Sequence, residues 1–140
     1  MPRIELWTTV FAGVSGGLAG VLWNGLVTTP WLARGTAVAP AAETAAHLVA
    51  GAALRVAAGA ALGFLFWLGW GLIAVVATPW YAVGLLYGGL CWAALAAPAL
   101  GTLLLRGYGP ARPVAAHAVE WLFTCVAIGL LCAFSWHRYA

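Results

Sequence analysis

The sequence predicts an all-α protein: a four-transmembrane-helix bundle that forms a single integral membrane domain over residues 1–140. Hydrophobic residues make up 65% of the chain and charged residues only 6%. A soluble domain has roughly a quarter of its residues charged, so this chain cannot cover a surface that faces water, and a lipid bilayer is its expected partner. Four segments also have the roughly 20 mostly apolar residues that a membrane-spanning helix needs, at about 6–27, 48–74, 83–105 and 114–136.

Prolines mark the expected ends of these helices, because proline stops or starts a helix: Pro30, Pro79, Pro110 and Pro113. The first segment is expected to be a retained helix. Its apolar run is longer than the core of a signal peptide, and Glu5 lies in the region that leads into it. Pro98 differs from the other prolines because it lies inside the third segment. A kink is therefore predicted in the third helix at Pro98.

Small residues recur at four-residue spacing in the first three segments. Lipid tails give apolar helices no hydrophobic reason to associate, so close backbone contact between small residues must supply the attraction. This pattern predicts tight helix packing, either inside the bundle or between copies of the chain. The residues expected at such contacts are Gly16, Gly20, Gly59, Gly63, Gly84 and Gly88.

Two opposite charges lie inside the apolar segments. Arg55 is seven residues beyond Leu48, and Glu120 is six residues beyond Val114, which places them roughly 10 and 9 Å along their helices. The second and fourth helices of a four-helix bundle run in the same direction, so the two side chains reach a similar depth. A charge in the bilayer core is costly unless it is paired or faces a wet cavity. We therefore predict that Arg55 and Glu120 form an ion pair.

Two histidines and a threonine accompany this pair. His47 begins the second helix, and His117 precedes Glu120 by three residues, so it shares the helical face of Glu120. Thr124 extends the same polar stripe one turn deeper. Three interpretations of the polar cluster remain open: an ion pair that only holds helices together, a path for an ion, proton or small solute, or a haem b site with His47 and His117 as ligands.

Other chemistry has little support in the sequence. The six arginines are scattered and form no basic stripe of the kind that binds nucleic acid. No phosphate-binding loop, metal-binding H-E-x-x-H pair or catalytic triad occurs, so we predict neither an enzyme nor a metal site. Cys91, Cys125 and Cys132 lie in apolar runs and are expected to act as small buried hydrophobic residues.

Several stretches resemble known membrane protein families. The segments "FAGVSGGLAGVLWNGLVTTPWL", "GLLYGGLCWAALAAPALG" and "EWLFTCVAIGLLCAF" are similar to helices of the probable cobalt-transporter subunit family CbtA, with "APALG" at residues 97–101 the most specific part. After it the chain reads "TLLLRGYGP", where that family continues with a proline- and acid-containing stretch, so no metal ligands are carried over. A histidine that opens a helix and a Gly-rich run before an internal proline also resemble the uncharacterised YagU-type inner-membrane proteins. These resemblances imply a multi-pass protein of a bacterial inner membrane.

The sequence therefore leads to a functional expectation with alternatives. The chain is expected to be a small transport-associated or accessory subunit that moves an ion or small solute along the polar cluster. The alternatives are a haem b-binding membrane anchor in electron transfer and a purely structural subunit of a larger membrane complex. Other membrane subunits or further copies of the chain are the expected protein partners. The arginines near the helix ends divide three against two between the two sides, so no orientation is predicted.

Overall fold

The computed structural model describes residues 6–34, 44–69, 79–107 and 109–139. Within these ranges every regular element is a helix and no strand occurs. Four continuous helical stretches are long and apolar enough to cross a membrane: Leu6–Ala33, Ala45–Leu68, Trp80–Leu105 and Ala111–Arg138. The predicted all-α class with four long apolar helices is therefore confirmed, and these helices indicate a multi-pass membrane protein.

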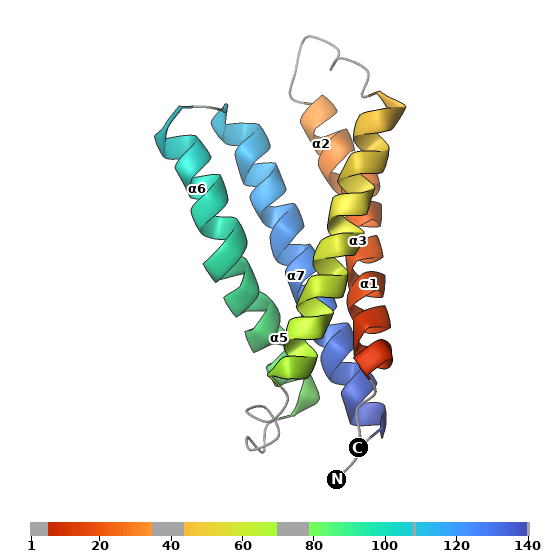
Figure 1. The fold of residues 1–140 in the computed structure, drawn as a ribbon. Coiled ribbons are helices and arrows are strands. Elements are labelled where there is room, and N and C mark those ends of the chain that lie inside the picture. The colour runs from red at the N-terminus through yellow and green to blue at the C-terminus, as the bar shows by residue number, and fades with distance from the viewer. Residues whose placement is uncertain (1–5, 35–43, 70–78, 108, 140) are drawn as a thin grey trace.

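The four helices form two pairs that meet along a central seam (Figure 1). The first pair is α1 (Leu6–Trp23) with α3 (Ala45–Leu68), and the second is α5 (Trp80–Cys91) with α7 (Ala111–Tyr139). Contact between α1 and α7 joins the pairs. The start of α1 and the end of α7 lie at one end of the bundle, and the short helices α2 (Thr29–Ala33) and α6 (Ala97–Leu105) lie at the other. We call the latter the α2–α6 end.

The first helical stretch continues through Pro30. The sequence placed its end near residue 27 because proline normally stops a helix, and this prediction is wrong: the helix runs on to Ala33. A π-helical turn, η1 (Asn24–Thr28), comes just before α2, and the backbone N–H of Thr29 donates to the carbonyl of Asn24 five residues earlier. The wider turn lets the chain accept a proline without ending the helix.

The third helical stretch repeats this arrangement at Pro98. A second π-helical turn, η2 (Trp92–Ala96), precedes α6, and the N–H of Ala97 donates to the carbonyl of Trp92. In both stretches the first π-helical residue lies six positions before the proline, so Asn24 corresponds to Trp92. The kink expected at Pro98 stays a prediction.

The other two helices begin slightly earlier than predicted. The side chain of Thr44 caps α3 by accepting the backbone N–H of His47, which places the helix start at Ala45. Helix α3 ends at Leu68, and the predicted continuation to residue 74 extends into residues 70–78, outside the described part of the chain. Helix α7 begins at Ala111 because Pro113 falls in its first turn, where a missing N–H costs nothing.

The six predicted packing glycines lie where helices meet within the chain. A Cβ atom on Gly63 would lie 2.7 Å from the carbonyl oxygen of Thr9 in α1, and one on Gly84 would lie 2.8 Å from the Cα of Leu130 in α7. Such distances allow no side chain, so glycine sets the close approach of these helices. Comparable backbone or side-chain contacts occur at the other four positions: Gly16, Gly20, Gly59 and Gly88.

The two helix pairs share one packing arrangement. The sequence Ala-Ala-His occurs at the start of α3 (residues 45–47) and again within α7 (residues 115–117), and a glycine follows twelve residues after each histidine, at Gly59 and Gly129. Gly59 lies against the backbone of Gly13, and Gly129 lies against the backbone of Gly84. Each pair is therefore joined by the same kind of glycine contact, twelve residues after the histidine of the shared Ala-Ala-His sequence.

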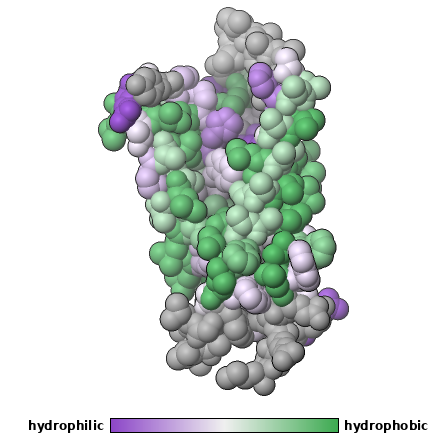
Figure 2. Space-filling model, in the orientation of Figure 1, coloured by the Kyte–Doolittle hydropathy of each residue, from purple (hydrophilic) through white to green (hydrophobic). Residues whose placement is uncertain are grey.

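The apolar core of the bundle is small. Its buried side chains include Phe66, Ile128 and Cys132, together with Cys125. Most large apolar side chains instead point outward, and Figure 2 shows them as a green surface along the sides of the bundle. An apolar exterior around a small core is what a bilayer, rather than water, would solvate.

Candidate functional site

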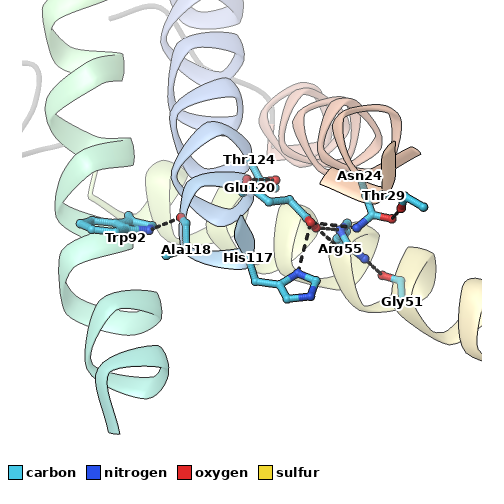
Figure 3. A network of polar contacts seen from close by, with 9 residues as sticks. All are labelled: Asn24, Thr29, Gly51, Arg55, Trp92, His117, Ala118, Glu120 and Thr124. Atoms are coloured by element: carbon cyan, nitrogen blue, oxygen red, sulfur yellow. Dashed lines mark hydrogen bonds and ion pairs between the residues drawn. The ribbon is translucent and has the colours of Figure 1, made fainter. Parts of the chain in front are cut away.

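Glu120 of α7 is the acidic residue at the centre of the site, and it is fully buried, with 0% exposure. Its carboxylate contacts side chains from three helical stretches (Figure 3). Asn24 donates from Nδ2 to Oε2 at 2.8 Å, and His117 places Nδ1 3.3 Å from the same oxygen. Arg55 binds the other oxygen, Oε1. We refer to Asn24, Arg55, His117 and Glu120 as the Glu120 cluster.

Arg55 reaches Glu120 from α3, as their similar depths predict. Its Nε donates to Oε1 at 2.7 Å, and its second terminal nitrogen binds the same oxygen. The other terminal nitrogen donates to the carbonyl of Gly51, one turn earlier, at 2.9 Å. The Arg55 side chain is 12% exposed, and its guanidinium carbon lies 5.9 Å from the ring centre of Trp121. These partners compensate a charge that would otherwise be costly to bury.

Asn24 was not among the residues predicted to form the cluster. Asn24 is the one asparagine of the chain and the first residue of η1, so its amide stands at a widened turn of the helix. π-helical turns often occur at functional sites because they redirect a side chain. A single asparagine inside an apolar segment, six residues before a proline, was the signal that could have identified it.

The two histidines differ in position. His117 lies on α7 beside Glu120 with 44% of its side chain exposed, so it connects the buried carboxylate to the surface of the bundle. His47 lies in the exposed first turn of α3, and in the described part of the chain its ring makes no hydrogen bond or ion pair with the cluster. The structure therefore brings His117 to the cluster but not His47. The haem b alternative, which uses both histidines, stays a prediction.

Thr124 marks the depth at which the polar stripe ends. Its hydroxyl donates to the backbone carbonyl of Glu120 at 2.8 Å, and its side chain is buried against Gly20 of α1. One and two turns further along α7 are Ile128 and Cys132, both fully buried. The face of α7 that contacts α1 is thus polar near the α2–α6 end and apolar below Thr124.

Trp92, at the start of the second π-helical turn, also binds α7. Its indole N–H donates to the carbonyl of Ala118 at 2.9 Å. Asn24 and Trp92 hold equivalent positions before their prolines, and they reach α7 at Glu120 and Ala118 (Figure 3). Both π-helical turns therefore direct a side-chain N–H toward the same short part of α7.

The chemistry of the cluster is that of a carboxylate whose charge is balanced within the protein. An imidazole beside a carboxylate can accept a proton on one side and pass it on the other, and ionisable groups inside a membrane commonly mark proton or ion paths. Among the residues that the structure describes, no group of three histidine, cysteine or acidic side chains could hold a metal ion. Comparisons with protein-family models, with curated proteins and with solved structures give no match to this chain.

Proposed function

We propose that this chain is a small multi-pass accessory subunit of a transport system in a bacterial inner membrane, and that its Glu120 cluster exchanges protons with the α2–α6 side. The main support for this proposal is the contact between the fully buried Glu120 carboxylate and the half-exposed His117 ring. A proton that reaches the imidazole from the surface is one contact away from the carboxylate. Arg55 and Asn24 hold that carboxylate in place from two other helical stretches.

The depth of the polar residues supports an accessory role rather than a complete channel. The stripe runs from His117 through Glu120 to Thr124, and the next residues on that face of α7 are apolar and buried. A charge that moved further along this face of α7 would pass the buried apolar side chains of Ile128 and Cys132, which is costly. We infer that a further membrane subunit completes the path.

The bacterial inner membrane and the link to transport rest on sequence resemblance. The stretches that resemble the CbtA family include the first helical stretch, with Asn24, and "EWLFTCVAIGLLCAF", which begins at Glu120. Two of the residues that form the cluster therefore lie in the segments that carry the resemblance. The cluster supports proton exchange in such a subunit and does not extend the proposal to cobalt or any other metal.

The test compares two histidine variants. The protein is purified in mild detergent, co-purifying membrane proteins are identified, and the complex is placed in liposomes that contain a pH-sensitive dye. His117→Ala is expected to slow proton entry on the order of 10²-fold, the lower end of what a positioned proton-transfer group contributes. His47→Ala is the matched control, since it removes an exposed histidine from the same Ala-Ala-His context, and it should leave the rate unchanged.

Two results would overturn the proposal. If His117→Ala and His47→Ala change the rate equally, or only in proportion to the amount of folded protein, the cluster is structural. If the chain purifies without any other membrane protein and conducts no protons, it is not an accessory transport subunit.

A further inference from the structure

A groove opens on the face of the bundle between α3 and the η2–α6 part of the third helical stretch. It has a volume of about 370 Å³, within the usual range for small-molecule sites. Helix α7 forms its floor. Its lining includes Ala58, Ala61 and Leu65 on α3, Ala99 on α6, and Trp121 and Cys125 on α7.

The groove exists because the two helix pairs differ at one equivalent position. Gly16 lies three residues after Gly13, and it lets α1 approach α7 closely. Tyr87 lies three residues after Gly84, so it holds the equivalent position on α5. Tyr87 instead spans the space to α3, where its hydroxyl donates to the carbonyl of Leu62 at 2.5 Å. A large side chain where the other pair has glycine therefore keeps α5 and α3 apart.

The groove changes from apolar to polar toward the α2–α6 end. On α7 the residues that follow one another at four-residue spacing are Cys125, Trp121 and His117, and His117 is half exposed. On α3 the residue one turn before Ala58 is Arg55, whose guanidinium lies over the Trp121 ring. Figure 2 shows hydrophilic residues between the green helices near this end of the same face.

A positive charge follows the helix that lines the groove, at the α2–α6 end. Helix α6, which lines the groove, ends at Leu105 and is capped by Arg106. Arg34 caps α2 at the same end of the bundle. Arg112, in the first turn of α7, instead donates to the carbonyl of Trp31 at 3.1 Å and lies over its ring, so it belongs to the side of the first helical stretch and not to the groove. The one acidic side chain among the described residues, Glu120, is buried and paired. Basic pockets between membrane helices attract anionic lipid headgroups.

We propose that this groove binds one anionic phospholipid, with an acyl chain along Ala61, Ala99 and Cys125 and the phosphate at the polar end, beside His117 and Arg106. An amphiphile fits because the groove is apolar over its length and Arg106 adds a positive charge at one end. A helix from a second copy of the chain would place apolar residues against the polar end of the groove as well as against its apolar length, so it matches the groove less well. The proposal does not rest on proton exchange by the Glu120 cluster.

The experiment measures lipid that stays bound to the full chain. Protein is exchanged into detergent with equal amounts of a phosphatidylglycerol and a phosphatidylcholine of the same acyl chains, and bound lipid is counted by native mass spectrometry. We expect one phosphatidylglycerol per chain. Ala61→Trp should abolish phosphatidylglycerol binding because the indole fills the groove. If that variant does not fold, Ala99→Trp fills the groove from the opposite wall and is tested in its place. Arg106→Gln should weaken binding about fivefold, the usual effect of one basic residue near an anionic lipid surface.

A second apolar hollow provides the matched control. It has a volume of about 360 Å³ and lies between the end of the first helical stretch and the start of α7, where it is lined by Trp23, Trp31 and Ala115. Ala115→Trp should leave phosphatidylglycerol binding unchanged. Equal retention of the two lipids, full retention in Ala61→Trp, or a dimer in which the groove is covered by a second copy would each overturn the proposal. Because no flux is measured, failure here leaves the proton proposal standing.

Discussion

The Nε of Arg55 donates a hydrogen bond to Oε1 of Glu120 at 2.7 Å, which joins α3 to α7 at one depth. Each residue lies about two helical turns beyond the start of its apolar segment, counted from the α2–α6 end of the bundle. Asn24 adds a donor to the second carboxylate oxygen at 2.8 Å. A fully buried carboxylate thus has a partner for both oxygens, which is the condition under which such a charge is tolerated.

Loss of one partner should destabilise the fold. Arg55→Leu leaves the Glu120 carboxylate buried without its cation, and we expect the free energy of unfolding to fall by about 3–5 kcal/mol, the usual cost of breaking a buried pair. Glu120→Gln should also destabilise the protein, because it strands the guanidinium. Denaturant or thermal unfolding in detergent measures both changes. The exchanged pair, Arg55→Glu with Glu120→Arg, should recover part of the loss, and no recovery would contradict a direct interaction.

Glycine contacts between helices should tolerate no larger residue. A Cβ atom on Gly63 would lie 2.7 Å from the carbonyl oxygen of Thr9, so Gly63→Leu must push α3 away from α1. We expect a loss of about 1–3 kcal/mol from overpacking, measured as lower thermal stability in detergent. Gly89→Leu is the control, because a Cβ at Gly89 meets no atom within 4 Å. Equal effects of the two variants would contradict the role assigned to Gly63.

Depth along a helix could be predicted from the sequence, whereas rotation about its axis could not. The depths of Arg55 and Glu120 followed from counting residues, since each residue adds a fixed rise. The contribution of Asn24 depended on a π-helical turn, which changes the direction of every side chain that follows it. The same turn explains why Pro30 does not end its helix. His47 was grouped with the cluster by sequence position, yet its place in an exposed first turn keeps it apart.

Thr9 offers a test of a buried polar atom. Its side chain is 1% exposed, and its hydroxyl oxygen has no hydrogen-bond partner among the described residues. Thr9→Val keeps the side-chain volume and removes a group that must lose its hydration without compensation. We expect the variant to be as stable as the original chain or more stable by about 1 kcal/mol, measured by thermal unfolding in detergent. A loss of more than about 1 kcal/mol would show that the hydroxyl has a partner.

Pro98 should determine both the π-helical turn before it and the predicted bend of the third helical stretch. Proline lacks an N–H, so Pro98→Ala restores a donor for the carbonyl of Ala94 and lets η2 relax toward an α-helix. The indole nitrogen of Trp92 lies 2.9 Å from the carbonyl oxygen of Ala118. Because each residue of an α-helix turns the chain by about 100°, a change from a π-helical to an α-helical turn should rotate Trp92 about the helix axis and break this hydrogen bond.

Two measurements on the Pro98→Ala variant check this expectation. The indole N–H signal of Trp92 in an NMR spectrum should move toward that of a solvent- or lipid-exposed indole. If the helix bends at Pro98, the distance between spin labels at the exposed positions Leu86 and Leu105 should lengthen in the variant, because the bent helix straightens. Pro110→Ala is the control, since Pro110 lies outside the helices. An unchanged distance together with an unchanged indole signal would mean that neither the bend nor the π-helical turn depends on Pro98.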